Sequence, residues 1–386
     1  MSYIRRHITK FRLLSTQVET RCLLYNNKYI KISGKDKSKF LQGLCSNDLN
    51  LLQNHGDCIA SVFLSSSGRI IVDALIYNVN KGATDSYFII ETHNKYATVL
   101  KNYLHSYKLR SAVSIEDANV FGMLIHNKIK THHVHNNLYD NVEFIVESID
   151  PRTSTLGNRV LMDKSVFTDE NNMIPLSTFQ NINESVTWYN KFRLINGIIE
   201  GPELYNLIPF ECNLDLLNYI SFKKGCYIGQ ELMARTQFKG IIRKRFIPFL
   251  SIDKNKSIQL GKLNVDLNVG FSEFNTLFNG NIDTIVSNDS NIIEIGDTLN
   301  FTIESKELSQ IDSSIVETNE VDYVGKVIVY DTNSKIGIAL VPLEIIRNSF
   351  NNVKCILKHA PATHVQLFKP YFWPELNPNT GKRFEE

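Results

Sequence analysis

The chain has 386 residues, a formal net charge of +2, and 43% hydrophobic against 21% charged residues. These proportions are typical of a globular protein, and the length allows two or three packed domains. The small net charge gives no electrostatic reason to expect a nucleic-acid partner. No apolar run approaches the ~18–20 residues that a membrane-spanning helix needs, so no membrane insertion is expected.

The six cysteines are scattered along the chain, without a Cys-x-x-Cys pair. This pattern argues against a disulfide scaffold and against a structural zinc site. Reduced thiols in an intracellular compartment are therefore expected.

The first 14 residues are basic, free of acids and interleaved with apolar side chains. Their basic residues are Arg5, Arg6, Lys10 and Arg12. This composition is typical of a mitochondrial presequence, and the segment 12–15 resembles a matrix-processing site with cleavage before Ser15. We therefore predict a presequence over 1–14 and a mitochondrial matrix location. The alternative is a disordered basic start.

The first half of the chain combines strand and helix signals. Apolar patterns predict strands over 23–32, 61–64, 70–77, 87–91, 113–115 and 120–125. Helical spacing predicts helices after Asp36, over 94–107, over 188–197 and over 230–237. Strand–helix–strand units interleaved with hairpins indicate the α+β class. Asp73 lies within the apolar strand 70–77, where an acid has to face a solvated cavity or find hydrogen-bond donors.

The pattern changes after Gly240. Predicted strands over 246–250, 321–330, 335–341 and 353–358, with glycines at bends, indicate a small closed or half-closed β-barrel. The segment 281–320 holds nine acids and a single base, Lys306. It is expected to be a solvated surface insertion, and the alternative is a docking surface for a basic partner.

Two further polar clusters each allow two interpretations. The histidine-rich segment 131–135 could suggest a metal site. It has no carboxylate or cysteine at ligand spacing, so a polar surface loop is the preferred interpretation. The basic cluster Arg243-Lys244-Arg245 either begins a strand and pairs with nearby acids, or holds an anion such as a phosphate or a polyglutamate tail.

The densest chemical motif is Lys224-Gly225-Cys226-Tyr227-Ile228-Gly229-Gln230-Glu231. Glycines permit backbone conformations or close approaches that a side chain forbids. Because a helix is predicted from Gln230, Cys226 is expected in the turn that leads into it. The helix N-terminus and the neighbouring Lys223 and Lys224 would favour the thiolate form of Cys226. The alternative is a cysteine that serves only as a small packed residue.

This motif resembles the signature of the YgfZ-type iron–sulfur cluster maturation proteins, which are relatives of the glycine-cleavage aminomethyltransferase, or T-protein. Other segments share the resemblance, and together with the motif they cover most of 23–250. They are 32–36, 40–44, 47–48, 67–70 with Asp73, 193–197, 200–201, 208–209, 213–215, Thr236 and 240–245. The predicted presequence indicates the mitochondrial branch of this family.

The resemblance implies a three-domain ring that ends in a C-terminal small β-barrel. It divides the chain into a folate-binding-like α+β region of two interleaved domains over 15–240 and a barrel domain over 241–386, interrupted by the insertion 281–320. It also implies maturation of mitochondrial [4Fe–4S] proteins such as aconitase and lipoyl synthase, with A-type cluster carriers as partners. Tetrahydrofolate and a transient iron–sulfur species are the cofactor candidates.

Candidate site residues follow from the motif and the resemblance. Cys226 is the candidate metal ligand, and Cys226 and Asp73 are the candidate catalytic residues. Asp73, Arg193 and Arg243 are the candidate cofactor-binding residues. The transferases carry a pterin-binding glutamate where this chain has Ile195, which cannot accept hydrogen bonds from a pterin ring. A folate-dependent aminomethyl or one-carbon transferase is therefore the alternative function, behind iron–sulfur cluster assembly.

Overall fold

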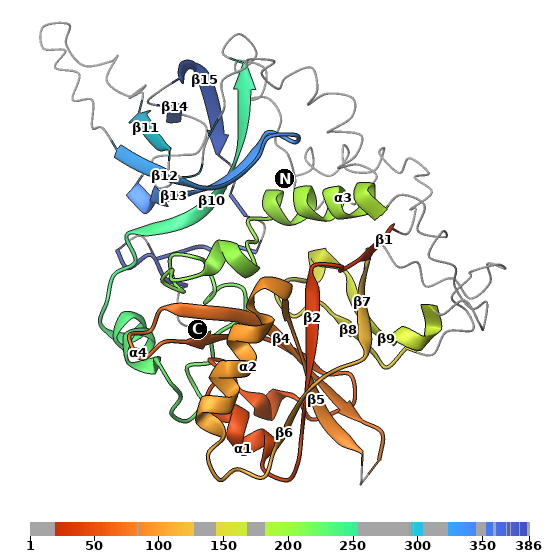
Figure 1. The fold of residues 1–386 in the computed structure, drawn as a ribbon. Helices are drawn as coiled ribbons and strands as arrows, with labels where there is room; N and C mark the ends of the chain where they lie inside the picture. The colour runs from red at the N-terminus through yellow and green to blue at the C-terminus, as the bar shows by residue number, and fades with distance from the viewer. Residues whose placement is uncertain are drawn as a thin grey trace, which may run out of the picture.

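The computed structural model of the chain (Figure 1) describes residues 20–82, 85–126, 144–167, 182–253, 293, 295, 297–303, 323–344, 353–357, 360–367, 369–370, 372–377 and 379–383. The predicted presequence 1–14, the histidine-rich segment 131–135 and most of the acidic insertion 281–320 lie outside the described residues. Among the residues that the structure describes, none of the helices has the length and apolarity needed to cross a lipid bilayer.

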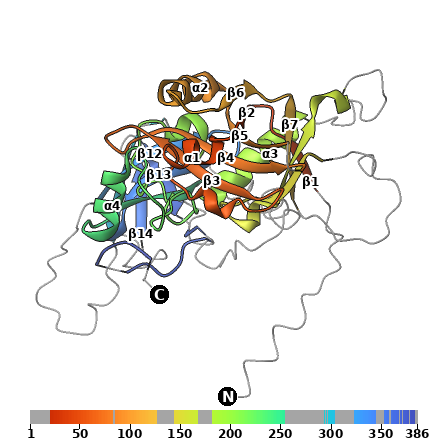
Figure 2. The same cartoon turned by 90° about the horizontal axis from the view of Figure 1, so that it is seen from below.

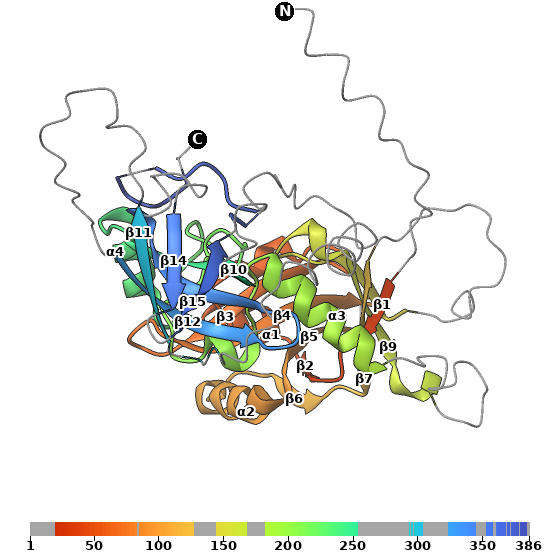
Figure 3. The same ribbon diagram turned by 90° about the horizontal axis from the view of Figure 1, so that it is seen from above.

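A five-stranded antiparallel sheet has the order β3-β4-β5-β2-β6. Its strands are β2 (Asn27–Ser33), β3 (Cys58–Leu64), β4 (Ile70–Asn80), β5 (Ser86–His93) and β6 (Ser114–Asp117). Helices α1 (Lys37–Gln42) and α2 (Asn94–Lys108) accompany this sheet, and Figures 2 and 3 show α2 on one of its outer faces. The helix forms there because Leu100 and Leu104, one turn apart, are both buried against the sheet.

Both faces of β4 are buried, and this places Asp73. Val72, Ala74 and Ile76 belong to the apolar cluster beneath α2, whereas Leu75 and Tyr77 belong to the larger core on the other side. Because successive side chains of a strand alternate between faces, Asp73 points to the side of Leu75 and Tyr77. The acid is therefore directed toward the interior of the molecule.

A second sheet of four strands has the order β1-β7-β9-β8. Its strands are β1 (Thr20–Leu23), β7 (Val120–His126), β8 (Val146–Ile149) and β9 (Asn158–Asp163). The prediction of one strand over 23–32 is wrong, because β1 pairs with β7 in this sheet and β2 pairs with β5 in the other. A turn closed by the N–H of Asn27 and the carbonyl of Leu24 divides the two strands. The asparagines at this turn interrupt an otherwise apolar pattern.

The C-terminal strands pair into a closed barrel in the order β10-β13-β12-β11-β14-β15. They are β10 (Lys244–Asp253), β11 (Thr298–Ile303), β12 (Tyr323–Asp331), β13 (Ile336–Pro342), β14 (Val353–Leu357) and β15 (Ala360–Leu367). Pairing between β10 and β15 closes the circle. Helix α3 (Ile182–Ile195) contacts β1 on one side and β10 and β13 on the other, and Figures 1 and 3 show it between the barrel and the sheets.

The remaining helical elements are η1 (Leu49–Leu51), η2 (Ser154–Leu156), η3 (Lys164–Phe167), η6 (Gly201–Leu204) and α4 (Gln230–Phe238). The α+β class and the helices α2 and α4 agree with the sequence prediction, to within one residue at the helix ends. The division into domains at residues 14 and 240 and the three-domain ring stay predictions.

Candidate functional site around Cys226 and Asp73

The cysteine motif begins with a lysine that fastens it to a distant part of the chain. The ammonium of Lys224 donates to three backbone carbonyls, at 2.8 Å from Gln42, 2.7 Å from Cys45 and 2.7 Å from Asn47. The first of these carbonyls belongs to the last residue of α1 and the other two follow the helix. The cation therefore lies where the helix dipole is negative and the last carbonyls lack partners inside the helix. Burial lowers the pKa of Lys224, and its ammonium also lies 5.0 Å from the centre of the Tyr227 ring.

Cys226 itself is exposed, whereas Cys22, Cys45 and Cys212 are buried and Cys58 is half-buried. The preceding Gly225 is also exposed, and a Cβ atom added there would meet no other atom within 4 Å. Its φ is not in the left-handed region. The expectation that both motif glycines answer a steric need is therefore wrong for Gly225. Its small size leaves open space beside the thiol.

At position 229, in contrast, a glycine is required for two steric reasons. Its φ is +80°, and a Cβ atom there would lie 2.5 Å from the carbonyl oxygen of Ser65 and 2.6 Å from Cβ of Leu64. Gly68, in the β3–β4 hairpin, also has φ +80° and would place a Cβ atom 2.6 Å from Cβ of Leu232 in α4. Two glycines 161 residues apart in sequence thus allow the hairpin and the start of α4 to pack closely.

The rest of the motif holds the turn after Cys226. The N–H of Tyr227 donates to the side-chain oxygen of Gln230 at 3.1 Å. The N–H of Ile228 donates to the carbonyl of Gly43 at 3.2 Å. Tyr227 is buried, and burial raises its pKa well above the usual value. Glu231 is exposed in the first turn of α4. The thiol of Cys226 is therefore presented to solvent from a turn that is fixed on both sides.

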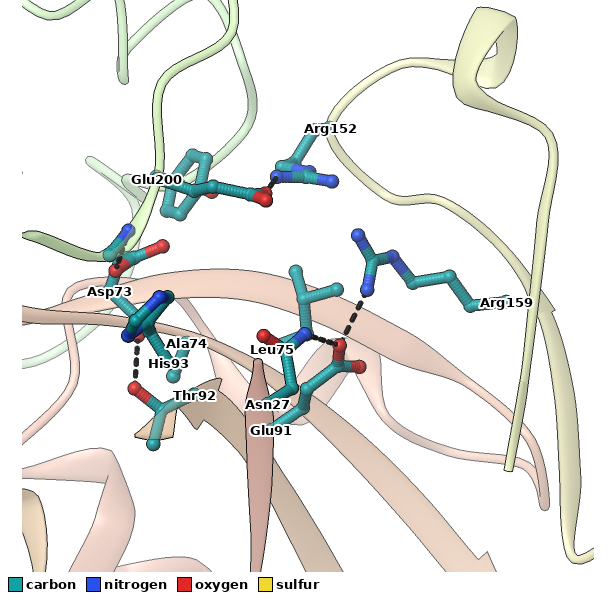
Figure 4. Close-up of a pocket in the computed structure, with 12 residues that line it drawn as sticks. Asn27, Asp73, Ala74, Leu75, Glu91, Thr92, His93, Arg152, Arg159 and Glu200 are labelled. Atoms are coloured by element: carbon teal, nitrogen blue, oxygen red, sulfur yellow. Dashed lines mark hydrogen bonds and ion pairs between the residues drawn. The ribbon is translucent and has the colours of Figure 1, made fainter. Parts of the chain in front are cut away.

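Asp73 lies in a different place, on the floor of a narrow cavity (Figure 4). Its carboxylate accepts a 2.9 Å hydrogen bond from the N–H of Gly201, and its carbonyl accepts one from Thr92. The pKa of Asp73 is raised to about 7, mainly because the carboxyl is buried and secondly because the negative charge of Glu200 is nearby. At neutral pH such a carboxyl is able both to donate and to accept a proton.

The wall beside Asp73 is a buried network of ion pairs that the sequence analysis did not find. Its pairs are Arg159–Glu91 at 2.6 Å, Arg159–Asp150 at 2.7 Å, Arg152–Asp150 at 2.9 Å and Arg152–Glu200 at 2.7 Å. Figure 4 shows Arg152 and Arg159 approaching Glu200 and Glu91 from one side of the cavity. Tyr77 and Asn27 also donate to Glu91. The paired arginines oppose the effect of burial and hold the pKa of Glu200 at about 2.

This network leaves little room next to Asp73. The cavity there has a volume of about 30 Å³, the space of roughly one or two water molecules. A second cavity of about 230 Å³ lies alongside it and shares Asn27, His93 and Glu200 in its wall. Its remaining lining comes from β1, from the β1–β2 turn, from α3 and from η6. Pockets for ligands of drug size usually measure ~300–1,000 Å³.

The candidate cofactor-binding arginines are not gathered at Asp73. Arg193 lines the larger cavity, but its guanidinium is held by both carboxylate oxygens of Glu203, at 2.7 Å and 2.6 Å. Arg243 is exposed and lines neither cavity. Its neighbour Arg245 is fully buried and paired with Asp215 at 2.7 Å. Of the two interpretations of the basic cluster, pairing with a nearby acid holds for Arg245.

Neither Cys226 nor Ile195 lines either of these two cavities, and Ile195 is packed in the hydrophobic core. The structure thus separates the two candidate catalytic residues into two sites: an exposed thiol and a buried carboxyl. A sequence signal for the missed network existed in Glu200, which belongs to a segment shared with the T-protein relatives. Arg152 and Arg159 lie in a stretch where the sequence patterns predict no helix or strand.

The comparisons with known proteins found no matching family model. The curated relatives include an iron–sulfur cluster assembly factor IBA57 homolog, mitochondrial, of Dictyostelium discoideum, which is 34% identical over 256 residues, 58% of this chain and 61% of the relative. The mitochondrial IBA57 protein of Mus musculus is 32% identical over 240 residues, 57% of this chain and 63% of the relative. The chain thus spans about three fifths of the length of these curated relatives.

The fold has a known counterpart as well. The crystal structure of glycine cleavage system aminomethyltransferase T from Bartonella henselae matches with a TM-score of 0.54 over 95% of this chain and 88% of that chain. The two sequences are only 10% identical, so this likeness concerns the fold alone. Taken together, the comparisons show that this chain is similar in sequence to proteins named iron–sulfur cluster assembly factor IBA57 and has the fold of an aminomethyltransferase.

Proposed function

We propose that this protein is an iron–sulfur cluster assembly factor of the mitochondrial matrix, and that Cys226 is its working ligand. The observation that carries the proposal is the exposed thiol of Cys226, the one exposed cysteine among the five whose side chains the structure describes. An exposed thiol on a turn held by Lys224, Ile228 and Gly229 is accessible and keeps a defined position. Accessible thiols of this kind are the ones that ligate metals or accept sulfur.

The iron–sulfur species is cargo in this proposal, because one thiolate is not enough to hold it. Iron–sulfur clusters are normally held by about four protein ligands. Within the described residues, no group of three or more histidine, cysteine or acidic side chains is placed to hold a metal ion. The remaining ligands would therefore come from a second protein or from small molecules. A-type carriers are the proposed partners, and [4Fe–4S] enzymes such as aconitase and lipoyl synthase are the proposed clients.

The proposed function is tested in mitochondria that depend on this protein. Cys226→Ala is expected to lower aconitase activity and protein lipoylation severalfold, while the protein accumulates at its normal level. Cys58→Ala is the matched control, since it removes a half-buried thiol that lies in neither the motif nor the turn. Normal aconitase activity and lipoylation in the Cys226→Ala strain would remove the role given to this residue.

A folate-dependent aminomethyl or one-carbon transferase is the second candidate, and one observation favours it. Asp73 is a buried carboxyl with a pKa of about 7 in a fold shared with an aminomethyltransferase. The small space next to Asp73 is an argument against this function, since the cavity there measures about 30 Å³ and is walled by ion pairs. Ile195 counts against it too. Titration calorimetry with tetrahydrofolate distinguishes the two functions. We expect no heat of binding, and micromolar binding would support the transferase function.

A further inference from the structure

Helix α4 presents an outward face with an unusual mixture of side chains. Glu231, Ala234, Arg235 and Phe238 are exposed, and their spacing of three or four residues places them on one stripe. Met233, on the opposite face, is fully buried. Phe238 is 67% exposed although it is the largest apolar residue of the helix. A large aromatic side chain left in water beside an arginine is typical of protein interfaces.

The segment that joins α4 to β10 also carries exposed side chains, and it lies at the edge of the molecule (Figures 1 and 2). There Ile241 is 57% exposed, next to the exposed Lys239 and Arg243. Within the described part of the chain, none of Arg235, Lys239 and Arg243 forms an ion pair. We call the surface formed by Arg235, Phe238, Lys239, Ile241 and Arg243 the α4 face. It combines two apolar side chains with three positive charges, and the carboxylate of Glu231 lies one helical turn from Arg235.

The α4 face rests on rigid support. The N–H of Ile242 donates to the carbonyl of Thr380 at 2.9 Å, and Gly381 packs against the carbonyl of Ile242. Lys382 donates to the carbonyl of Gln237 near the C-terminal end of α4. At the other end, Leu232 is packed on Gly68. A partner would therefore meet a preformed surface, which lowers the entropy lost on binding.

Cys226 lies just before the start of α4. The thiol precedes the first residue of α4 by four positions, a distance of at most ~14 Å along the chain. The helix, of nine residues, is itself about 13 Å long. A single standard interface buries about 800 Å² on each partner. One partner is thus large enough to cover the α4 face and reach Cys226 at the same time.

We propose that the α4 face docks the acidic surface of the protein that supplies the remaining thiolate ligands at Cys226. The inference rests on the proposed function, which requires those ligands from a second protein. Charge complementarity selects an acidic partner, since Glu231 is the one exposed acid of α4 beside these cations. Phe238 and Ile241 form the apolar centre of the interface, and the cations form its rim. Because the surroundings of Gly225 are open, the partner can reach the thiol of Cys226.

The test measures anaerobic binding of a purified, [2Fe–2S]-loaded A-type carrier to the full chain at 50 and 200 mM salt. Phe238→Ser is expected to weaken binding about tenfold, in the range of a buried interface anchor. Arg235→Glu combined with Lys239→Glu is expected to weaken it at least as much and to reduce its salt dependence. Lys28→Glu and Ile149→Ser change equally exposed residues outside the α4 face and should bind normally. Ile149 is in β8, on the opposite side of Figure 1.

Wild-type carrier affinity in both α4-face variants would overturn the inference. Tighter binding of a 20-nucleotide single-stranded RNA than of the carrier, lost in Arg235→Glu/Lys239→Glu, would overturn it in favour of a nucleic-acid partner. The two proposals fail separately. If the α4-face variants bind the carrier normally and the Cys226→Ala variant is inactive, only the docking role of the α4 face is contradicted. If the α4-face variants lose binding and the Cys226→Ala variant is fully active, the docking role of the α4 face is supported and the role of the thiol is contradicted.

Discussion

The ammonium of Lys224 donates to the carbonyl oxygen of Cys45 at 2.7 Å, although the two residues lie 179 positions apart in sequence. Together with the bonds to Gln42 and Asn47, this contact fastens the cysteine motif to the end of α1. The lysine beside the cysteine therefore has a clear structural role: it sets the position of the turn that carries the thiol. Its role in favouring the thiolate of Cys226 stays a prediction.

Lys224→Met is expected to lower the free energy of unfolding by about 3 kcal/mol. The substitution removes three charge-assisted hydrogen bonds and leaves three carbonyls without their donor. Lys223→Met is the matched control, because this neighbouring lysine is exposed and surface substitutions usually change stability by less than about 0.5 kcal/mol. Urea unfolding of both variants measures the difference. Equal stabilities would contradict the anchoring role of Lys224.

The two glycines of the motif are expected to differ sharply on substitution. Gly229→Ala should destabilise the protein by about 2 kcal/mol or more, because it combines a left-handed φ with contacts under 3 Å to Leu64 and Ser65. Gly225→Ala should leave the stability within about 0.5 kcal/mol, since its surroundings are open. Thermal unfolding compares the two. A larger loss for Gly225→Ala would contradict the geometry of the turn.

Asp73 is expected to make stability depend on pH. Its folded pKa of about 7 lies above the ordinary value of 3.8, so the folded state binds more protons than the unfolded state between these pH values. Its contribution to stability is therefore fully present below about pH 4 and is lost as pH rises to about 7. Asp73→Asn should gain stability relative to the wild type over this interval, by up to a few kcal/mol. An unchanged difference between the two proteins from pH 4 to 8 would refute the raised pKa.

The buried ion-pair network is expected to be intolerant of a single deletion. Arg159→Met leaves Glu91 and Asp150 with one partner fewer in the interior, and such a loss typically costs about 3–5 kcal/mol. Lys101→Met breaks the exposed pair with Asp117 and should cost less than about 1 kcal/mol. Chemical denaturation of both variants checks the contrast. Similar small losses would show that the network contributes little to the fold.

Thiol labelling tests the exposure on which the proposed site depends. Among the five cysteines whose side chains the structure describes, Cys226 should react first with a maleimide in the native protein, because the other four are buried or half-buried. Burial also raises the pKa of Cys45, Cys58 and Cys212, which keeps them in the unreactive thiol form. Mass spectrometry of peptides after brief labelling identifies the modified residue. First labelling at Cys212 would contradict the fold around the motif.

Local sequence patterns predicted the elements whose signals are local. The tyrosine and leucine spacing of α2 and the apolar face of α4 place both helices correctly. The buried setting of Asp73 follows from an acid within an apolar strand. The Arg159–Glu91 pair joins residues 68 positions apart, and no pattern within one segment reports such a pairing. The same holds for the contact of Gly68 with Leu232.

The separation of the two candidate residues also depends on tertiary structure. In sequence, Cys226 and Asp73 both belong to segments that resemble one family, and this resemblance predicts a common site. The structure assigns Cys226 to an exposed turn and Asp73 to a buried cavity. The alternation of β4 determines the direction of Asp73, and the anchor at Lys224 determines that of Cys226.

Anaerobic co-reconstitution with an A-type carrier tests the central claim most directly. Wild-type protein and Cys226→Ser are each mixed with the carrier, ferrous iron and a sulfide source, and formation of [4Fe–4S] clusters is followed by Mössbauer and visible spectroscopy. We expect clusters to form with the wild type and to be strongly reduced with Cys226→Ser, whose fold is intact by circular dichroism. Equal cluster formation by the two proteins would contradict the assignment of Cys226 as the working ligand.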